Sequence, residues 1–171
     1  MRILGIDPGV ATVGFGVIES SGSNLKMVRC GVITTPAKQR LALRLSRIYT
    51  DMSEIIDMFK PDCIAIEELF FNTNLTTGIA VAHGRGVIIL AGENKDIPMY
   101  EYTPLQIKQA LTGYGRAEKR QVMDMVKRQL NLSQKAKPDD ASDALAVAIC
   151  HARYSSSLLN IEGNGTECFT I

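Results

Sequence analysis

The chain begins with Met1-Arg2-Ile3-Leu4-Gly5-Ile6-Asp7-Pro8-Gly9, a short apolar run that ends in an acid and a turn sequence. A second run of this kind, Asp62-Cys63-Ile64-Ala65-Ile66-Glu67, lies further along the chain. Both runs predict β-strands. Side chains alternate between the two faces of a strand, so each run places small residues on one face and an acid at its carboxyl end.

Turn residues and hydrophobic spacing predict the other elements around these two strands. Further strands are expected over Val13–Glu19, Lys26–Thr35 and Ile97–Tyr102. Apolar residues recur at three- and four-residue steps from Leu41 to Phe59, which predicts an amphipathic helix. More helices are expected over about residues 74–93, 104–113, 118–130 and 138–154. The 74–93 helix is rich in small residues, which favours close approach to another helix, in this subunit or in a partner.

The resulting order, β-β-β-α-β-α-β-α-α-α, predicts an α/β fold with a five-stranded mixed sheet and helices on both faces. A right-handed crossover would place the second acid-bearing strand parallel to the first and close to it. Asp7 and Glu67 would then lie side by side, at the carboxyl ends of strands where α/β sheets bind ligands. Regular pleating sends Glu68 to the opposite face, which favours Glu67 as the functional acid.

The composition is that of one globular domain, expected over residues 1–154 with a peripheral tail over residues 155–171. With 46% hydrophobic and 22% charged residues, no membrane-length apolar run and no leader pattern, we expect a cytoplasmic protein without membrane association. The four cysteines and two histidines show no zinc-ligand spacing. Residues 108–137 contain eight basic and two acidic residues, which indicates either a face for a polyanion or a solvated helix surface.

Two more acids begin the last expected helix in the run Asp140-Ala141-Ser142-Asp143. Residues three apart share a helical face, so both carboxylates can reach one ion. The helix dipole alone would explain acids in the first turn, but Asp143 lies in the second turn among apolar residues and fits that explanation less well.

Four converging carboxylates would repel one another strongly without cations. Oxygen ligands suit Mg²⁺ or Mn²⁺, and one or two such ions support phosphodiester hydrolysis. The residues therefore predict a metal-dependent nuclease with four metal-binding acids: Asp7, Glu67, Asp140 and Asp143.

Four motifs together resemble the RuvC family of Holliday junction resolvases over about residues 1–154. They are Gly5-Ile6-Asp7-Pro8-Gly9, Ala65-Ile66-Glu67 with an aromatic soon after it, Ala117-Glu118-Lys119, and Asp140-Ala141-Ser142-Asp143-Ala144-Leu145-Ala146. The resemblance implies a ribonuclease-H-like fold, a homodimer, and Mg²⁺-dependent paired, symmetric nicking of four-way DNA junctions in recombination and repair. It also implies partnership with the RuvA and RuvB branch-migration complex.

Carried over residue by residue, the resemblance makes the four acids the family's metal ligands, although some relatives have His at the position of Asp143. It implies that Lys108 and Lys119 approach the scissile phosphate. Lys119 has independent support, because it begins an expected helix where the dipole disfavours cations; simple solvation is the alternative. Arg116 and Arg120 are expected to contact DNA.

Two neighbouring aromatic residues, Phe70 and Phe71, follow the second acid-bearing strand. Phe70 matches the family's aromatic position, where stacking on an unpaired base is worth roughly 1–3 kcal/mol. Closure of the core is the alternative role for both rings.

Three other functions are compatible with parts of this pattern. An RNA-processing nuclease would share the architecture and the acids. A phosphate-binding module of the actin and sugar-kinase type also ends its first strand in Asp-x-Gly, but it needs a second similar domain. A noncatalytic junction binder would gain nothing from four acids that repel DNA.

Overall fold

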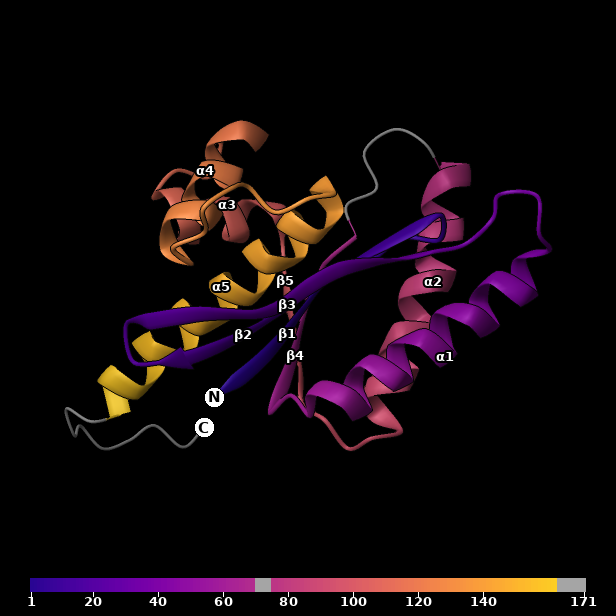
Figure 1. The fold of residues 1–171 in the computed structure, drawn as a ribbon, viewed down its shortest axis with the longest axis horizontal. Helices are drawn as coiled ribbons and strands as arrows, with labels where there is room; N and C mark the ends of the chain where they lie inside the picture. The colour runs from indigo at the N-terminus through magenta and orange to yellow at the C-terminus, as the bar shows by residue number, and fades with distance from the viewer. Residues whose placement is uncertain (70–74, 163–171) are drawn as a thin grey trace, which may run out of the picture.

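The computed structural model describes residues 1–69 and 75–162, which form a five-stranded mixed sheet between two layers of helices (Figure 1). The strand order is β3-β2-β1-β4-β5. Strand β1 pairs antiparallel with β2 and parallel with β4, and β5 extends the parallel side, as the crossover rule predicts. The strands are β1 (Arg2–Asp7), β2 (Thr12–Ser21), β3 (Asn24–Thr34), β4 (Cys63–Glu67) and β5 (Met99–Tyr102).

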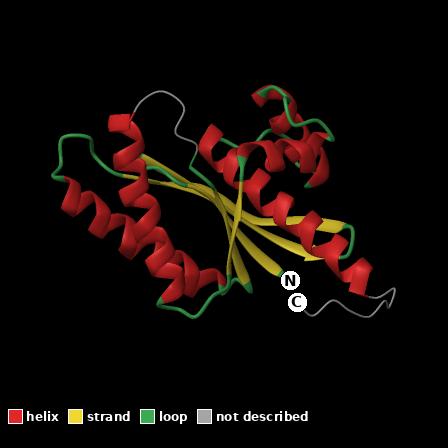
Figure 2. Cartoon of the chain, turned by 180° about the vertical axis from the view of Figure 1, so that it is seen from behind, coloured by secondary structure: helices red, strands yellow, loops and turns green. Residues whose placement is uncertain are grey.

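Helices cover the two faces of the sheet separately (Figure 2). One layer contains α1 (Leu41–Phe59) and α2 (Leu75–Glu93), and the other contains α3 (Pro104–Thr112), α4 (Lys119–Gln129) and α5 (Asp139–Glu162). Alternation along the strands separates the core accordingly: Leu4 and Ile64 belong to the cluster that also holds buried residues of α1 and α2, whereas Ile3 and Ala65 belong to the one with α5. The acids at the ends of β1 and β4 therefore lie on the α5 face.

Local sequence signals fix where α3 and α4 begin. The Thr103 hydroxyl accepts the N–H of Gln106, whose side-chain oxygen accepts the N–H of Thr103, and Pro104 occupies the first helical turn. Gly113 ends α3 in the left-handed conformation, at φ 74°. At the start of α4 the Gln121 side chain accepts the N–H of Glu118.

Helix α5 lies directly against the backbone of β1 and β2, at positions where the strands carry glycine. A β-carbon on Gly5 would overlap the carbonyl oxygen of Ala144, and one on Gly14 would overlap the carbonyl oxygen of Asp140. A β-carbon on Gly16 would come within 2.8 Å of the Leu145 side chain. Only glycine lets the helix axis approach the sheet this closely.

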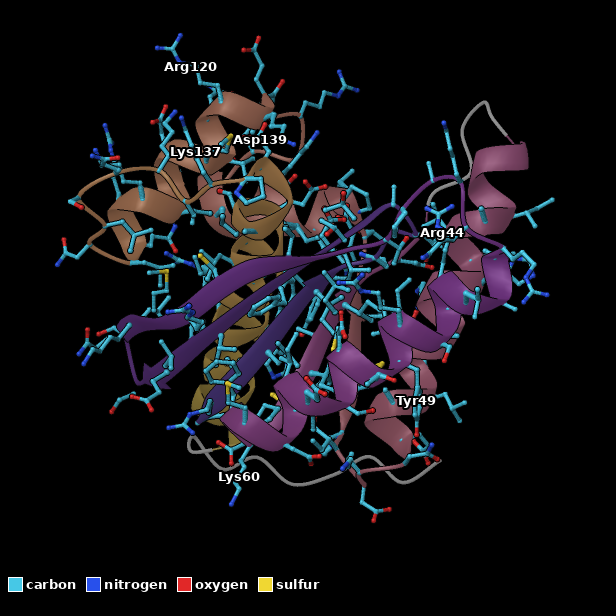
Figure 3. All side chains as sticks on the ribbon, turned by 45° about the vertical axis from the view of Figure 1, so that its right-hand side comes forward. Arg44, Tyr49, Lys60, Arg120, Lys137 and Asp139 are labelled. Carbon is cyan, nitrogen blue, oxygen red and sulfur yellow. The ribbon has the colours of Figure 1, made fainter. Side chains whose placement is uncertain are left out.

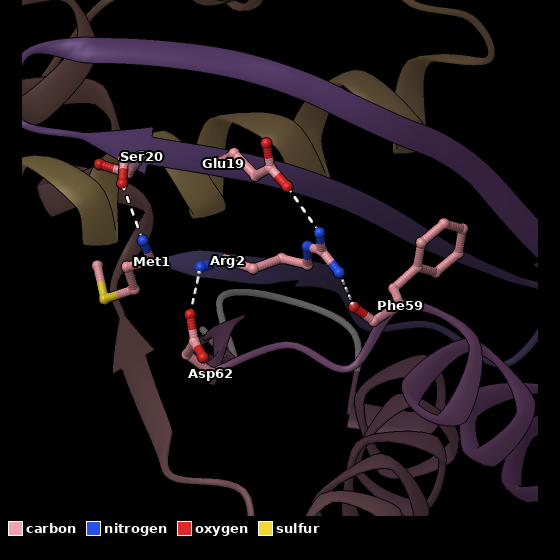
Figure 4. A network of polar contacts seen from close by, with 6 residues as sticks. All are labelled: Met1, Arg2, Glu19, Ser20, Phe59 and Asp62. Carbon is pink, nitrogen blue, oxygen red and sulfur yellow. Dashed lines mark hydrogen bonds and ion pairs between the residues drawn. The ribbon is translucent and has the colours of Figure 1, made fainter.

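Polar contacts tie the amino ends of β1 and β4 to the carboxyl end of the antiparallel strand β2 (Figure 4). The Arg2 guanidinium donates to the Phe59 carbonyl oxygen at 2.7 Å and pairs with Glu19 at 2.6 Å, while the Arg2 N–H donates to Asp62 at 2.6 Å. These bonds hold β1 and β4 in register at their starts, and so align Asp7 with Glu67 at their ends.

One expectation from the sequence is corrected by the structure. Helix α5 continues to Glu162, past its expected end near residue 154, so the first part of the supposed tail is helical. Helix α2 packs beside α1, in line with the expected approach to another helix, and Gly84 also meets the loop after β1, where the Gly9 carbonyl oxygen lies 2.6 Å from a built β-carbon. Within the part of the chain that the structure describes, no helix combines the length and apolar character that a membrane crossing requires.

The contact between α5 and β1 is testable by a small substitution. Gly5→Ala should lower the free energy of unfolding by roughly 1–3 kcal/mol, because the new methyl group overlaps helix backbone and the helix must shift. Chemical denaturation measures this change. Glu54→Ala, at an exposed position on α1, should change the free energy of unfolding by less than about 0.5 kcal/mol; equal effects of the two substitutions would contradict the packing argument.

Candidate active site

A pocket of about 300 Å³ opens at the carboxyl ends of β1 and β4, between the sheet and the helices α3, α4 and α5. Its charged lining consists of three acids and two lysines: Asp7, Glu67, Asp143, Lys108 and Lys119. The rest of the wall is apolar and consists of Pro104, Ile107, Val122 and Ala146. Side chains from five separate elements thus meet in one place.

Asp7 and Glu67 lie side by side, because β1 and β4 pair in parallel with Ile6 opposite Ile66. Burial, followed by the charges of Glu67, Asp143 and Asp140, raises the pKa of Asp7 to about 7. Burial and the Asp143 charge raise the pKa of Glu67 to about 7 as well. Glu68 is exposed and does not line the pocket, as its position on the other face of the strand predicts.

The two acids of α5 occupy different positions relative to the pocket. Asp143 lines it, with a side chain that is 26% exposed. Asp140 does not line it, but lies in the first turn of α5 above Gly14, which is the register partner of Asp7. Its charge still acts on Asp7, whose pKa it raises. The structure therefore brings three of the predicted acids together and places the fourth beside them.

Lys119 reaches into this acidic cluster from the first turn of α4. Its ammonium group donates to Asp143 at 2.7 Å and lies 3.8 Å from Asp139. The hydrogen bond to Asp143, with the charges of Asp143, Asp139 and Asp7, raises the pKa of Lys119. Lys108, from α3, lines the pocket, and its charge opposes the rise in the pKa of Glu67 that burial and Asp143 cause. Both lysines offset part of the repulsion among the carboxylates.

The donor chemistry of the pocket fits a divalent cation. Hard carboxylate oxygens are the ligands of Mg²⁺ and Mn²⁺, and acids whose pKa is raised by burial and mutual repulsion gain most from a bound cation. The side chains are not drawn together into a cage: within residues 1–69 and 75–162, no three Asp, Glu, His or Cys side chains are close enough to hold an ion as they stand. Side-chain rotation would have to bring the ligands in.

The remaining predicted residues lie outside the pocket or outside the described part of the chain. Arg116 and Arg120 are exposed and line no part of it, and Figure 3 shows Arg120 projecting outward from α4. Phe70 and Phe71 fall outside the described residues. The apolar wall of the pocket was not predicted from the sequence. Helical spacing could have indicated part of it, because Val122 lies on the same helical face as Lys119, and Ala146 on the same face as Asp143.

Comparisons with known proteins agree on one family. The family model described as crossover junction endodeoxyribonuclease RuvC matches residues 3–151. A relative from Desulforamulus reducens with that name is 54% identical over 92% of this chain and 96% of its own length. The solved structure of Thermus thermophilus RuvC superposes with a TM-score of 0.86 at 33% identity, covering 92% of this chain and 96% of the other. The structure of the same protein in complex with a Holliday junction substrate gives a TM-score of 0.85 at 31% identity, with the same coverage.

The raised pKa values predict how stability depends on pH. Because the folded-state pKa of Asp7 and Glu67 lies near 7, above the unfolded values, the stability they contribute is fully present below about pH 4 and is lost as pH rises through about 7. In a chelating buffer at pH 8, Glu67→Gln should therefore raise the free energy of unfolding by on the order of 1–3 kcal/mol. Glu54→Gln, an exposed acid on α1, serves as the control. No gain for Glu67→Gln over this control would show that the repulsion is absent.

Proposed function

The chain belongs to the RuvC family of crossover junction endodeoxyribonucleases, and we propose that its acidic pocket hydrolyses the backbone of four-way DNA junctions with divalent cations. It is a nuclease with the ribonuclease-H-like α/β fold of that family. The proposed nuclease unit is residues 1–154, and the proposed place of action is the cytoplasm, because the substrate is DNA.

One observation carries the proposal: acids from β1, β4 and α5 line a single pocket together with two lysines. A pocket that needed only to bind phosphate would present cations or N–H groups without buried carboxylates. Clustered carboxylates beside lysines suit a reaction in which cations and a phosphodiester meet. This argues against both the kinase-like module and a noncatalytic junction binder.

Each residue has a proposed task in the reaction. Asp7, Glu67 and Asp143 would hold the metal, with Asp140 as a further ligand, and one or two Mg²⁺ or Mn²⁺ ions would activate water and stabilise the leaving oxygen. The Lys119 ammonium group donates to Asp143 and also lines the open pocket. It could therefore move from the carboxylate to a phosphate oxygen of a bound substrate. Lys108 is proposed to contact a phosphate from the other side.

The basic segment around the pocket supplies the proposed DNA surface. Residues 108–137 include the second half of α3, all of α4 and the adjoining loops, which cluster beside the start of α5 (Figure 1). Arg116 and Arg120 lie exposed on this surface and are proposed to bind backbone phosphates. Phe70 and Phe71 are proposed to stack on unpaired bases at the junction.

A homodimer would give the two cuts that a symmetric junction requires. Helix α2 presents an exposed stripe at four-, three- and four-residue steps, formed by Ile79, His83, Gly86 and Leu90. Ile79 is 56% exposed and Leu90 52%, so the stripe offers apolar surface to a partner, and Gly86 leaves room for a close partner helix. We propose that two copies pair through this stripe, and that the dimer works with RuvA and RuvB.

The metal assignment predicts a separation of cutting from binding. Asp7→Asn should reduce Mg²⁺-dependent junction cleavage by more than the roughly 100-fold cost of losing an outer-shell partner, because a direct ligand is removed. Junction binding should persist, since the basic surface is unchanged. Gel assays of cleavage and binding measure both. Glu68→Gln, the neighbouring exposed acid, should cleave normally; full activity of Asp7→Asn would exclude Asp7 from the reaction.

The role of Lys119 is tested by comparing it with its neighbour. Lys119→Ala should slow single-turnover cleavage by about 100-fold while changing junction affinity little, because its charge acts on the reacting phosphate. Arg120→Ala, an exposed cation outside the pocket, should weaken binding without slowing cleavage at saturation. The opposite pattern for Lys119 would make it a docking residue.

The dimer proposal predicts that a charged substitution in the α2 stripe halves the molecular mass of the particle in solution. Leu90→Glu should convert the dimer to a monomer in analytical ultracentrifugation, because a charge is buried in the stripe. Leu105→Glu, which alters an apolar residue that is 62% exposed on the other helical layer, should remain a dimer. A monomeric wild-type chain, or a dimeric Leu90→Glu variant, would contradict pairing through α2.

A further inference from the structure

A second basic surface lies at the start of α1, on the opposite helical layer from α3 and α4. It consists of Lys38, Arg40, Arg44 and Arg47, and residues 35–50 contain no acid. Lys38, Arg40 and Arg47 are exposed, and Arg44 is half-buried. We call these four residues the α1 basic surface.

Hydrogen bonds connect this surface to the loop that follows β1, the strand that ends in Asp7. The Arg44 Nε donates to the Thr35 hydroxyl at 2.8 Å, and that hydroxyl donates to the carbonyl oxygen of Val10. The Thr35 N–H donates to the carbonyl oxygen of Ala11 at 3.0 Å. Since Val10 is three residues from Asp7, the Arg44 guanidinium lies at most roughly 20 Å from the Asp7 backbone.

The figures place the surface at the same end of the molecule as the pocket. Figure 3 shows Arg44 toward the end at which α5 begins with Asp139, whereas Lys60 lies at the opposite end. The carboxyl ends of β1 and β4 point to this end as well. The α1 basic surface and the pocket lie on opposite faces of the sheet, so a ligand that contacts both passes across the carboxyl ends of β1 and β4.

The charges of this surface are poorly compensated within the chain. Arg47 pairs with Asp51 at 3.4 Å, but Lys38, Arg40 and Arg44 have no acidic partner among the described residues. Arg40 is the N-cap residue of α1 without a side-chain capping bond, and the first turn contains no acid. Cations at a helix start are disfavoured by the dipole, so this arrangement costs stability without an internal benefit.

We propose that the α1 basic surface binds the phosphates of a duplex arm of the junction whose strand is cut in the adjacent pocket. The inference rests on the proposed function and extends it with a second set of DNA contacts. One helical turn of DNA covers about 34 Å, which exceeds the roughly 20 Å between Arg44 and the Asp7 backbone, so the first turn of an arm that starts at the pocket is long enough to reach Arg44. The pocket at the same end of the molecule favours DNA over an acidic protein as the ligand, because one DNA molecule can contact both.

The test compares two triple variants with the same loss of charge. Lys38→Ala/Arg40→Ala/Arg47→Ala removes the exposed cations and leaves the Arg44–Thr35 bond intact. Lys26→Ala/Arg29→Ala/Lys60→Asn removes three exposed cations elsewhere, on β3 and before β4. Affinity for a synthetic four-way junction is measured in a chelating buffer over a range of salt concentrations, and melting temperatures check that both variants fold.

Each phosphate contact contributes about 0.9 to the slope of log affinity against log salt, so three lost contacts should lower the slope by roughly 2 to 3 and the affinity by about 10-fold or more. The control triple should keep the wild-type slope. Equal behaviour of the two triples would overturn the inference. Wild-type cleavage with Mg²⁺ is measured in parallel: its absence would refute the proposed function, whereas cleavage with equal slopes would refute only the α1 basic surface.

Discussion

Helix α5 packs on β1 and β2 at positions where these strands carry glycine, and the acidic pocket depends on this contact. Gly5, Gly14 and Gly16 let the helix backbone approach β1 and β2 within van der Waals distance. The approach places Asp143 over the ends of β1 and β4, and Asp140 beside them. Larger residues at these positions would lift the helix away, and the carboxylates would separate. The fold thus forces together like charges that would otherwise move apart.

That forced proximity explains the electrostatics of the site. Burial and repulsion raise the pKa of Asp7 and Glu67 to about 7, which means that their ionised forms are disfavoured in the chain alone. Lys119 offsets part of this repulsion through its hydrogen bond to Asp143. The hydrophobic clusters on the two faces of the sheet maintain the arrangement, because the stability they supply exceeds what the carboxylates remove. A bound divalent cation would favour the ionised forms and so remove much of this repulsion.

Sequence reasoning succeeded where periodicity decides the outcome. Alternation in β1 and β4 predicted that Asp7 and Glu67 are neighbours and that Glu68 faces away, and capping residues predicted where α3 begins. It failed for features that local sequence patterns do not determine. The helix end was predicted too early, near residue 154, because the serine-rich composition does not end α5, which continues to Glu162. The apolar wall of the pocket and the link from Arg44 through Thr35 to Val10 arise from segments distant in sequence, which no local pattern reveals.

The central claim is that acids from three elements hold divalent cations in one pocket, and anomalous diffraction from crystals grown with Mn²⁺ tests it most directly. The account predicts a Mn²⁺ peak ligated by Asp7 together with Glu67 or Asp143, and its loss on substitution of Asp7 by Asn. Well-ordered crystals at saturating Mn²⁺ without a peak in this pocket, or with a peak held only by residues elsewhere, would contradict it.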